Sequence, residues 1–274
     1  MKILFIGDIA GQAGREMLNA HLEKIKAHHE ADIVIVDGDN SANGFGITEK
    51  ICKEYYDLGT DCITTGNHVW DQREILSYIT RDPSLLRAAN YPDTTPGQGA
   101  CIKSLPDGRK ILIMHLMGRV YMPESLDCPF ATADKILKNY QLGANINAIF
   151  VDIHAEATSE KMALAHYLDG RVSAVVGTHT HIPTADCHIL ENGTGFQTDA
   201  GMTGCYDSVI GMEKDIPILR FTRKIPGKNR MTPAKGKGTL CGTIIKTDDS
   251  TGKTLSIEPV ILGAFLKNQN SYLD

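Results

Sequence analysis

Five apolar runs of the sequence end in side chains that could bind metal ions. The candidate ligands at these positions are Asp8, Asp39, Asn40, Asn67, His154, His179 and His181. They offer carboxylate, carboxamide and imidazole groups but no thiolate, and such a set suits iron, manganese or zinc ions. Seven ligands are too many for one tetrahedral ion. They match two divalent ions that share a carboxylate, and such a pair can hold a hydroxide that attacks a phosphoryl group.

The spacing of His179 and His181 as H-x-H leaves two arrangements open. In an extended segment, side chains two residues apart point to the same side. In a turn, the same spacing could let the two imidazoles reach two different metal ions. Either arrangement is compatible with a metal site after an apolar strand.

Each candidate also has a structural explanation when it is taken alone. Asp8 could cap the N-terminus of a helix, and Asn67 could cap a helix that begins near Trp70 and Asp71. His154 could be a buried histidine whose hydrogen bonds are satisfied within the fold, and the pair at residues 39–40 could form an ordinary turn. These explanations give no reason for all the residues to stand at strand ends. A ligand-binding crevice at the carboxyl ends of strands does give one.

Four other features near these positions are ambiguous. Glu156 could orient a ligand histidine or simply face solvent, and Arg119 could meet a substrate phosphate or form an ordinary salt bridge. His115 ends a strand but lacks a partner motif. The glycine-containing run at residues 7–14 resembles a phosphate loop. Its spacing is not G-x-G-x-x-G and Asp8 would repel a phosphate, so a nucleotide-binding module is the weaker hypothesis.

Short runs rich in Ile and Val predict the strands that must position the candidate ligands. The predicted strands are residues 3–7, 33–37, 62–65, 111–115, 148–153 and 172–177. Helical faces are predicted between them, with apolar positions Leu18, Leu22 and Ile25, and later Met162, Leu164, Ala165 and Leu168. This alternation of strands and helices predicts an α/β fold.

Beyond about residue 185 the pattern changes to turns rich in Gly and Thr. Strand candidates at residues 240–246 and 255–261 are expected to form a second, more antiparallel sheet. The basic stretch 222–238 is expected to be a surface loop or a long hairpin. We expect residues 1–274 to form a single domain, because α/β enzymes of this length often do.

Composition limits the classes of partner. The net charge of −5 argues against a long nucleic acid, and the absence of any apolar stretch near 18 residues argues against a membrane span. The seven cysteines are scattered without a C-x-x-C pair, which favours free thiols in a reducing, cytoplasmic compartment. A homo-oligomer is compatible with the sequence.

Six runs of residues, taken together and in order, resemble one known family. They are G-D-x-x-G at residues 7–11, N-G-F-G-I-T at 43–48, T-T-G-N-H-V-W-D at 64–71, V-D-I-H-A-E-A-T-S-E-K at 151–161, V-V-G-T-H-T-H-I-P-T-A-D at 175–186 and T-D-A-G-M-T-G-C-Y-D-S-V-I-G-M at 198–212. The chain thereby resembles the YmdB-like family of bacterial calcineurin-type metallophosphoesterases. The last 60 or so residues match less distinctively.

The resemblance implies a four-layer α/β/β/α sandwich with two divalent metal ions, iron or manganese, zinc also being compatible. It implies hydrolysis of small phosphodiesters, 2′,3′-cyclic nucleotides above all, by a metal-bridging hydroxide. It assigns His68 as general acid and Asp39 as the bridging ligand. The remaining ligands divide into Asp8, Asn40 and His181 for the first metal ion, and Asn67, His154 and His179 for the second.

One position departs from the family pattern. The family usually has G-E-N where this chain has Gly38, Asp39 and Asn40. Aspartate retains the carboxylate but is one methylene shorter, so the resemblance still implies metal binding. The alternative of a non-catalytic regulator or scaffold with a structural metal centre is disfavoured by His68, because such a protein needs no general acid.

Overall fold

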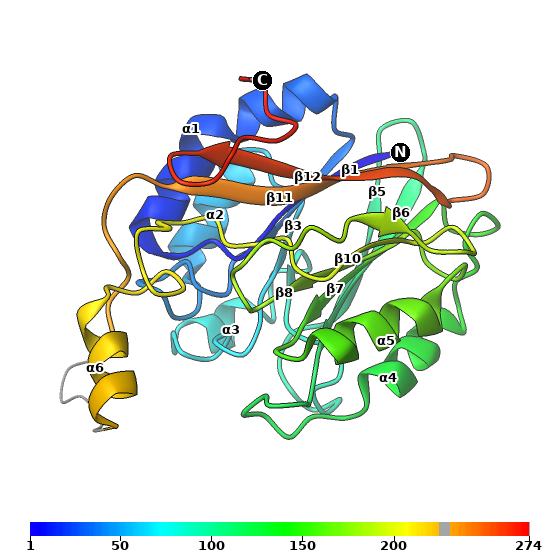
Figure 1. Cartoon of the computed structure of the whole chain (residues 1–274). Coiled ribbons are helices and arrows are strands. Elements are labelled where there is room, and N and C mark those ends of the chain that lie inside the picture. The colour runs from blue at the N-terminus through cyan, green and yellow to red at the C-terminus, as the bar shows by residue number, and fades with distance from the viewer. Residues whose placement is uncertain (225–230, 274) are drawn as a thin grey trace.

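The chain forms two sheets stacked face to face, with helices on the outer face of each (Figure 1). The structure is a computed structural model that describes residues 1–224 and 231–273. The termini of the described chain lie on the same side of the molecule as the last two strands (Figure 1). The four layers confirm the predicted α/β/β/α architecture.

The first sheet has the strand order β12-β11-β1-β2-β3-β4. Its strands are β1 (Lys2–Ile6), β2 (Ile33–Asp37), β3 (Cys62–Thr64), β4 (Leu85–Leu86), β11 (Thr239–Thr247) and β12 (Thr254–Gly263). Strands β1 to β4 run parallel, whereas β11 is antiparallel to both β1 and β12. The parallel strands therefore end at the same edge.

The second sheet has the order β5-β6-β7-β8-β10-β9. Its strands are β5 (Ala100–Ser104), β6 (Lys110–Met117), β7 (Ala148–His154), β8 (Ala174–Thr178), β9 (His188–Ile189) and β10 (Gly195–Gln197). Strands β6, β7, β8 and β10 are parallel to their neighbours in that series, and the two edge strands are antiparallel.

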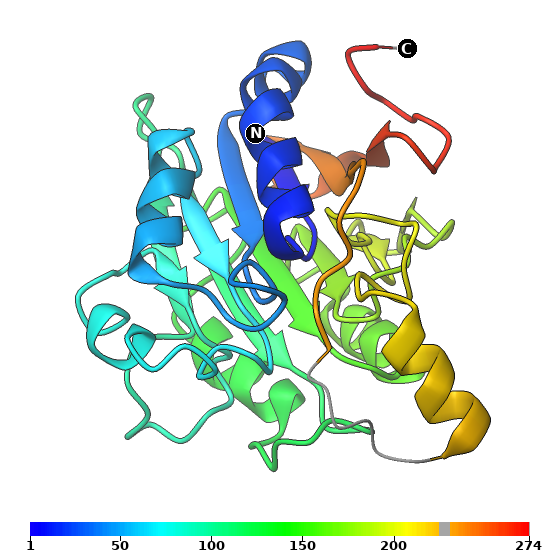
Figure 2. The same ribbon diagram turned by 90° about the vertical axis from the view of Figure 1, so that its left-hand side faces the viewer.

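Helices cover the outer faces of the sheets. In chain order the described helices are α1 (Gly11–His29), α2 (Glu49–Asp57), α3 (Ile75–Tyr78), α4 (Pro129–Leu137), α5 (Thr158–Leu168) and α6 (Asp215–Arg223), of which α6 lies apart from the sheets. Helices α1 and α2 contribute to the core of the first sheet, and α4 and α5 to the core of the second. Figure 2 shows α1 and α2 side by side on the first sheet, with α6 projecting at the opposite edge of the molecule.

Alternation along β1 shows why its residues are apolar on both faces. Ile3 and Phe5 belong to the core between the sheets, whereas Leu4 and Ile6 belong to the core beneath the helices. The rings of Phe5 and Phe150 lie 5.0 Å apart across the gap. Strands buried on both faces have continuous apolar sequences. The bounds of the strands predicted in the first two-thirds of the chain are confirmed to within a few residues.

Several expectations were wrong in detail. The C-terminal strands do not form a sheet of their own, because β11 pairs antiparallel with β1 and extends the first sheet. Met162 is 42% exposed and does not share the buried face of α5. Helix α3 begins at Ile75 rather than near Trp70. Residues 222 and 223 end α6, and residues 225–230 of the predicted loop lie outside the described residues. The described helices include none long and apolar enough to cross a bilayer.

Candidate metal centre

The seven predicted ligands come together in one buried region between the two sheets, as two neighbouring groups. In the first group, Nε2 of His154 is the central atom. It lies 3.0 Å from Oδ1 of Asn67, 3.1 Å from Nδ1 of His179 and 3.6 Å from Oδ2 of Asp39. Four potential ligand atoms from β2, β3, β7 and β8 or the loops after them thus face one point.

The second group is centred on Nε2 of His181. This atom lies 3.1 Å from Oδ1 of Asn40 and 3.8 Å from Oδ1 of Asp8. The Asp8 carboxylate also accepts the backbone N–H of His179, at 3.2 and 3.3 Å. Because His179 faces the first group, Asp8 connects the two.

The H-x-H segment is a turn rather than a strand. The backbone φ angle is 94° at His179 and 68° at His181, values that residues other than glycine seldom adopt. The two imidazoles consequently face the two different groups. Strained backbone of this kind persists where surrounding contacts fix it and is concentrated at functional sites.

The structural explanations for single residues fail at two positions. Helix α1 has Ala10 at its N-cap, so Asp8 does not cap it. Helix α3 begins eight positions after Asn67, whose side chain instead contacts His154. Both side chains are directed towards the candidate ligands.

Burial shapes the electrostatics of this region. Burial and neighbouring carboxylates raise the pKa of Asp8 well above its usual value, and burial raises the pKa of Asp39 to about 6. Burial lowers the pKa of His154 and His181, and lowers that of His179 to about 4. The histidines are therefore neutral at pH 7, and neutral imidazole is the form that binds metal.

This arrangement of charge fits bound cations. Among the described residues, the ion pairs of Asp8 and Asp39 involve only histidines. Buried carboxylates without a cationic partner are costly, whereas a divalent ion offsets their charge and accepts their lone pairs. The donor set, with oxygen and imidazole nitrogen only, is the one expected for two divalent ions.

Asp37 is a member of this region that the sequence reasoning missed. Its Oδ2 atom lies 3.5 Å from Nδ1 of His154 and has no hydrogen-bond partner in the described chain. Asp8, Asp37 and His154 offer ligand atoms that all lie within 4.8 Å of one another. The available signal was an acidic residue that ends an apolar strand, as Asp8 follows β1.

A buried hydrogen-bond chain fixes the orientation of His154. Thr178 donates its hydroxyl proton to Oδ1 of Asp152 at 2.9 Å. The same hydroxyl oxygen lies 3.0 Å from Nδ1 of His154 and must accept a proton from it, since its own is already engaged. Nε2 of His154 is then left with its lone pair directed at the first group of ligands.

Removing the Thr178 hydroxyl tests this chain. Thr178→Val keeps the shape of the side chain but leaves Nδ1 of His154 without its acceptor, and metal affinity should fall about 10–100-fold. Thr64→Val is the matched control, because Thr64 is also a buried threonine at a strand end and its hydroxyl has no hydrogen bond in the described structure. Metal titration of both variants by calorimetry checks the prediction, and equal affinities would contradict it.

His68 lies at the edge of the region rather than within either group. Its side chain is 27% exposed, and its Nδ1 is 2.8 Å from Oδ2 of Asp71. Its backbone N–H donates to Asp39 Oδ1 at 3.0 Å, and its ring packs edge-on against Phe45. Asp71, expected to begin a helix, instead orients this histidine.

Gly66 makes room for the first group. A Cβ atom at this position would lie 2.2 Å from Nε2 of His154, far inside van der Waals contact. Gly66→Ala should therefore displace the His154 ring and lower metal occupancy. Gly108→Ala is the control, since no atom lies within 4 Å of its Cβ position, and it should affect only stability. Elemental analysis of the two purified variants makes the comparison, and full occupancy in Gly66→Ala would refute the steric argument.

A buried ion pair supports the turn that carries the two histidines, and it too escaped the sequence reasoning. Lys161 on α5 donates to Oδ2 of Asp199 at 2.8 Å and to the backbone carbonyl of Thr178 at 2.7 Å. Asp199 also accepts from the hydroxyl of Thr180 at 2.6 Å. Both charged side chains are fully buried, so each needs the other.

The ambiguous residues lie as follows. Glu156 places Oε2 3.3 Å from Nε2 of His179, the position of an orienting partner. His115 is buried, with Nδ1 3.2 Å from Oδ2 of Asp152 but without hydrogen-bond geometry, and it is not among the ligand groups. Arg119 is exposed, and its backbone N–H donates to Glu160.

Stacked sheets with parallel strands ending at one buried centre define the calcineurin-like phosphoesterase fold. YfkN of Bacillus subtilis, a calcineurin-like phosphoesterase, shares this fold with a TM-score of 0.55 at 13% identity over 95% of this chain and 90% of that structure. A family model described as YmdB-like protein matches residues 4–260, and the chain belongs to this family.

Two relatives cover nearly the whole chain. A 2′,3′-cyclic-nucleotide 2′-phosphodiesterase of Bacillus subtilis is 45% identical over 262 residues, which make up 96% of this chain and 97% of the relative. A crystal structure described as a novel phosphatase of Mycoplasma pneumoniae is 31% identical with a TM-score of 0.89, covering 96% of this chain and 93% of that one. The family predicted from the sequence motifs is thus confirmed.

Proposed function

We propose that the chain is a single-domain, dinuclear-metal phosphodiesterase that hydrolyses 2′,3′-cyclic nucleotides. The observation that carries this proposal is the meeting of the seven candidate ligands in two groups of oxygen and imidazole donors. The substrate class is supported by the name of the Bacillus subtilis relative, at 45% identity. That name also indicates that the ester at the 2′ oxygen is the one hydrolysed.

We assign the ligands by their grouping. Asn67, His154 and His179 would hold one ion, and Asp8, Asn40 and His181 the other. Asp39 would bridge the ions, because it lies 3.6 Å from His154 in the first group and precedes Asn40, which contacts His181 in the second. Iron or manganese is the proposed metal, with zinc compatible with the same donors.

The bound ions would supply a hydroxide nucleophile at neutral pH and offset charge on the phosphoryl oxygens. The residues of the chain would orient the catalytic groups and protonate the leaving oxygen. Asp71 accepts from Nδ1–H of His68, which directs Nε2 outward to protonate the departing 2′ oxygen. The product is then a nucleoside 3′-phosphate. Asp71 and Thr178 act as positioning residues, through His68 and His154 respectively.

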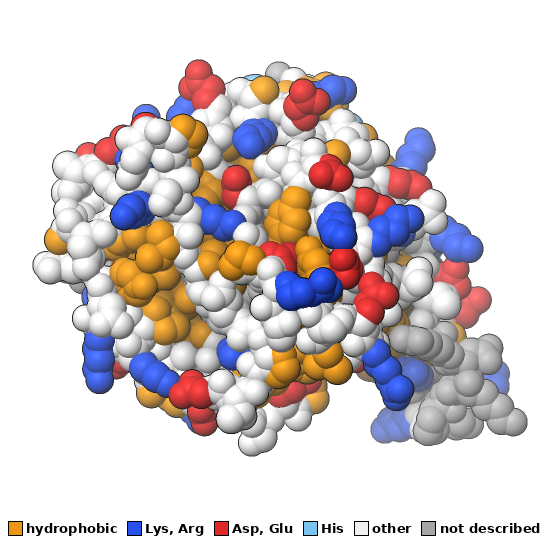
Figure 3. Space-filling view, turned by 180° about the vertical axis from the view of Figure 1, so that it is seen from behind, with side chains coloured by type: hydrophobic (Ala, Val, Ile, Leu, Met, Phe, Trp, Pro, Cys, Tyr) orange, Lys and Arg blue, Asp and Glu red, His pale blue; other side chains and the backbone are white. Residues whose placement is uncertain are grey.

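Charge and thiol chemistry support the proposed setting. On the face shown in Figure 3, basic and acidic side chains are interspersed, without a continuous basic surface for a long nucleic acid. All seven cysteines are free, which is consistent with a reducing cytoplasmic compartment. We therefore propose a cytoplasmic enzyme whose substrate is a small phosphodiester.

A substrate screen tests the proposed function. Protein purified without added metal is assayed with 2′,3′-cyclic nucleotides, linear diesters and phosphomonoesters, and products are separated by chromatography. We expect the cyclic nucleotides to be hydrolysed fastest, giving the 3′-phosphate. Faster hydrolysis of monoesters would overturn the substrate assignment, and no hydrolysis by metal-loaded protein would favour the regulator or scaffold hypothesis. The enzyme names of the relatives argue against that hypothesis.

A further inference from the structure

A pair of cysteine thiols lies where the two sheets meet, away from the ligand groups. Cys62 on β3 belongs to the first sheet, and Cys101 on β5 belongs to the second. Their Sγ atoms are 3.7 Å apart. Both residues contribute to the core between the sheets, and Cys62 is fully buried there.

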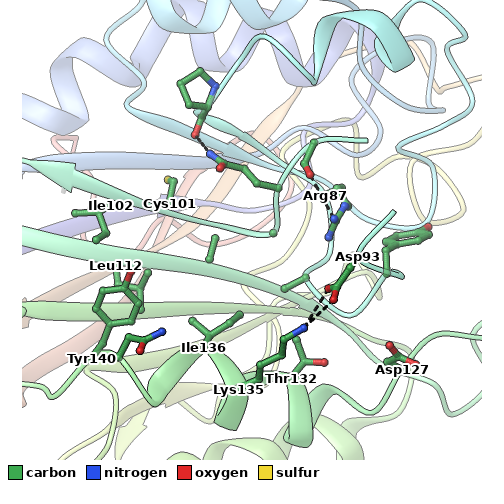
Figure 4. A pocket seen from close by; sticks show the side chains of 18 of the residues that line it. Arg87, Asp93, Cys101, Ile102, Leu112, Asp127, Thr132, Lys135, Ile136 and Tyr140 are labelled. Atoms are coloured by element: carbon green, nitrogen blue, oxygen red, sulfur yellow. Dashed lines mark hydrogen bonds and ion pairs between the residues drawn. The ribbon is translucent and has the colours of Figure 1, made fainter. Parts of the chain in front are cut away.

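Cys101 differs from Cys62 in access to solvent. It is partly exposed and lines a pocket of about 1040 Å³ between β5 and α4. In Figure 4, Cys101 and Ile102 lie at one end of this pocket, and Arg87, Asp93 and Lys135 lie at the other. A small reagent can thus reach Cys101, whereas Cys62 is fully buried.

The surroundings also favour Cys101 as the nucleophile. The hydrogen bond between the two thiols lowers the pKa of Cys101, and Lys103 on the same strand lowers it further, while burial opposes both effects. Burial raises the pKa of Cys62. A partly exposed thiol with a lowered pKa and a buried second thiol beside it are the arrangement of an attacking and a resolving cysteine.

We propose that Cys62 and Cys101 form a reversible disulfide in response to peroxide. The Cys101 thiolate attacks one oxygen of hydrogen peroxide, the O–O bond breaks, and the departing hydroxide takes a proton to leave as water. The sulfur of Cys62 then attacks the resulting sulfenic acid, the S–O bond breaks, and a second water leaves. Two thiols are oxidised and one peroxide is reduced to two waters.

Only a small movement is needed to bring the two sulfur atoms into bonding distance. A disulfide places its sulfur atoms about 2.05 Å apart, so the 3.7 Å separation must close by side-chain rotation and a small movement of the edge strand β5. β5 is an edge strand of its sheet, and β3 pairs on one side with the two-residue β4. The bond would join the two sheets covalently.

Peptide mapping under non-reducing conditions tests this proposal on the full-length, metal-loaded protein. After mild hydrogen peroxide treatment, we expect a linked peptide containing Cys62 and Cys101, a loss of two free thiols, and recovery of both thiols on reduction. In Cys62→Ser, Cys101 should be trapped as a sulfenic acid by a cyclic 1,3-diketone probe.

Cys128 provides the matched control. It is also partly exposed and lines the same pocket, but its sulfur has no thiol neighbour among the described residues. Cys128→Ser should therefore form the linked peptide at the wild-type rate. Failure to form the linked peptide, or oxidation of Cys128 as fast as Cys101, would overturn the proposal. Because thiol mapping requires no phosphodiester, this result is independent of the proposed activity.

Discussion

Asp39→Asn is expected to remove most bound metal and nearly all phosphodiesterase activity. The substitution preserves the size of the side chain but removes the charge that would be shared between two cations. Because Asp39 would bind the metal directly, the loss of metal affinity should exceed about 10–100-fold, which is the loss typical of removing a residue that hydrogen-bonds to a metal ligand. Elemental analysis of protein purified without added metal, combined with the rate of cyclic nucleotide hydrolysis, gives the measurement.

Two further variants make the interpretation specific. Asp82→Asn removes a buried carboxylate that binds Tyr56 and the backbone of Ser84, away from the ligand groups, and should retain its metal. Asp39→Glu introduces the residue that the family usually has at this position and should also retain metal. Full metal occupancy in Asp39→Asn would refute the bridging role.

His68→Ala is expected to keep its metal and lose turnover by about 10²–10⁴-fold, the usual range for a general acid. The reason is geometric, because His68 lies at the edge of the region and pairs with Asp71 rather than with the ligand groups. Metal content and kcat are measured on the same preparation. An unchanged kcat would remove His68 from the mechanism.

His166→Ala serves as the control for this substitution. His166 lies on the exposed side of α5 and should affect neither property. Asp71→Asn should give an intermediate loss of turnover with full metal content, because His68 would lose its orienting carboxylate but keep its imidazole. A loss of metal in His68→Ala would instead place this residue among the ligands.

The ends of buried strands made most of the site predictable. Asp8, Asn67 and His154 follow apolar runs that are visible in the sequence, and parallel strands bring their ends to one edge. The two conformations that H-x-H allows could not be distinguished, because the positive φ values of His179 and His181 depend on contacts from other segments.

Contacts between the two sheets could not be predicted from the sequence. The sequence predicts Asp37 only as the last residue of a strand, and its proximity to His154 exists because the two sheets stack. The pairing of β11 with β1 could not be predicted for the same kind of reason, since a strand's apolar pattern does not specify its neighbour. The role of Asp71 likewise depends on the conformation of the loop that contains it.

Metal-edge anomalous diffraction from crystals of the protein as purified tests the central claim most directly. We expect two strong peaks, one among Asn67, His154 and His179 and the other among Asp8, Asn40 and His181, with Asp39 between them. An absence of peaks, or peaks located elsewhere in the molecule, would contradict it.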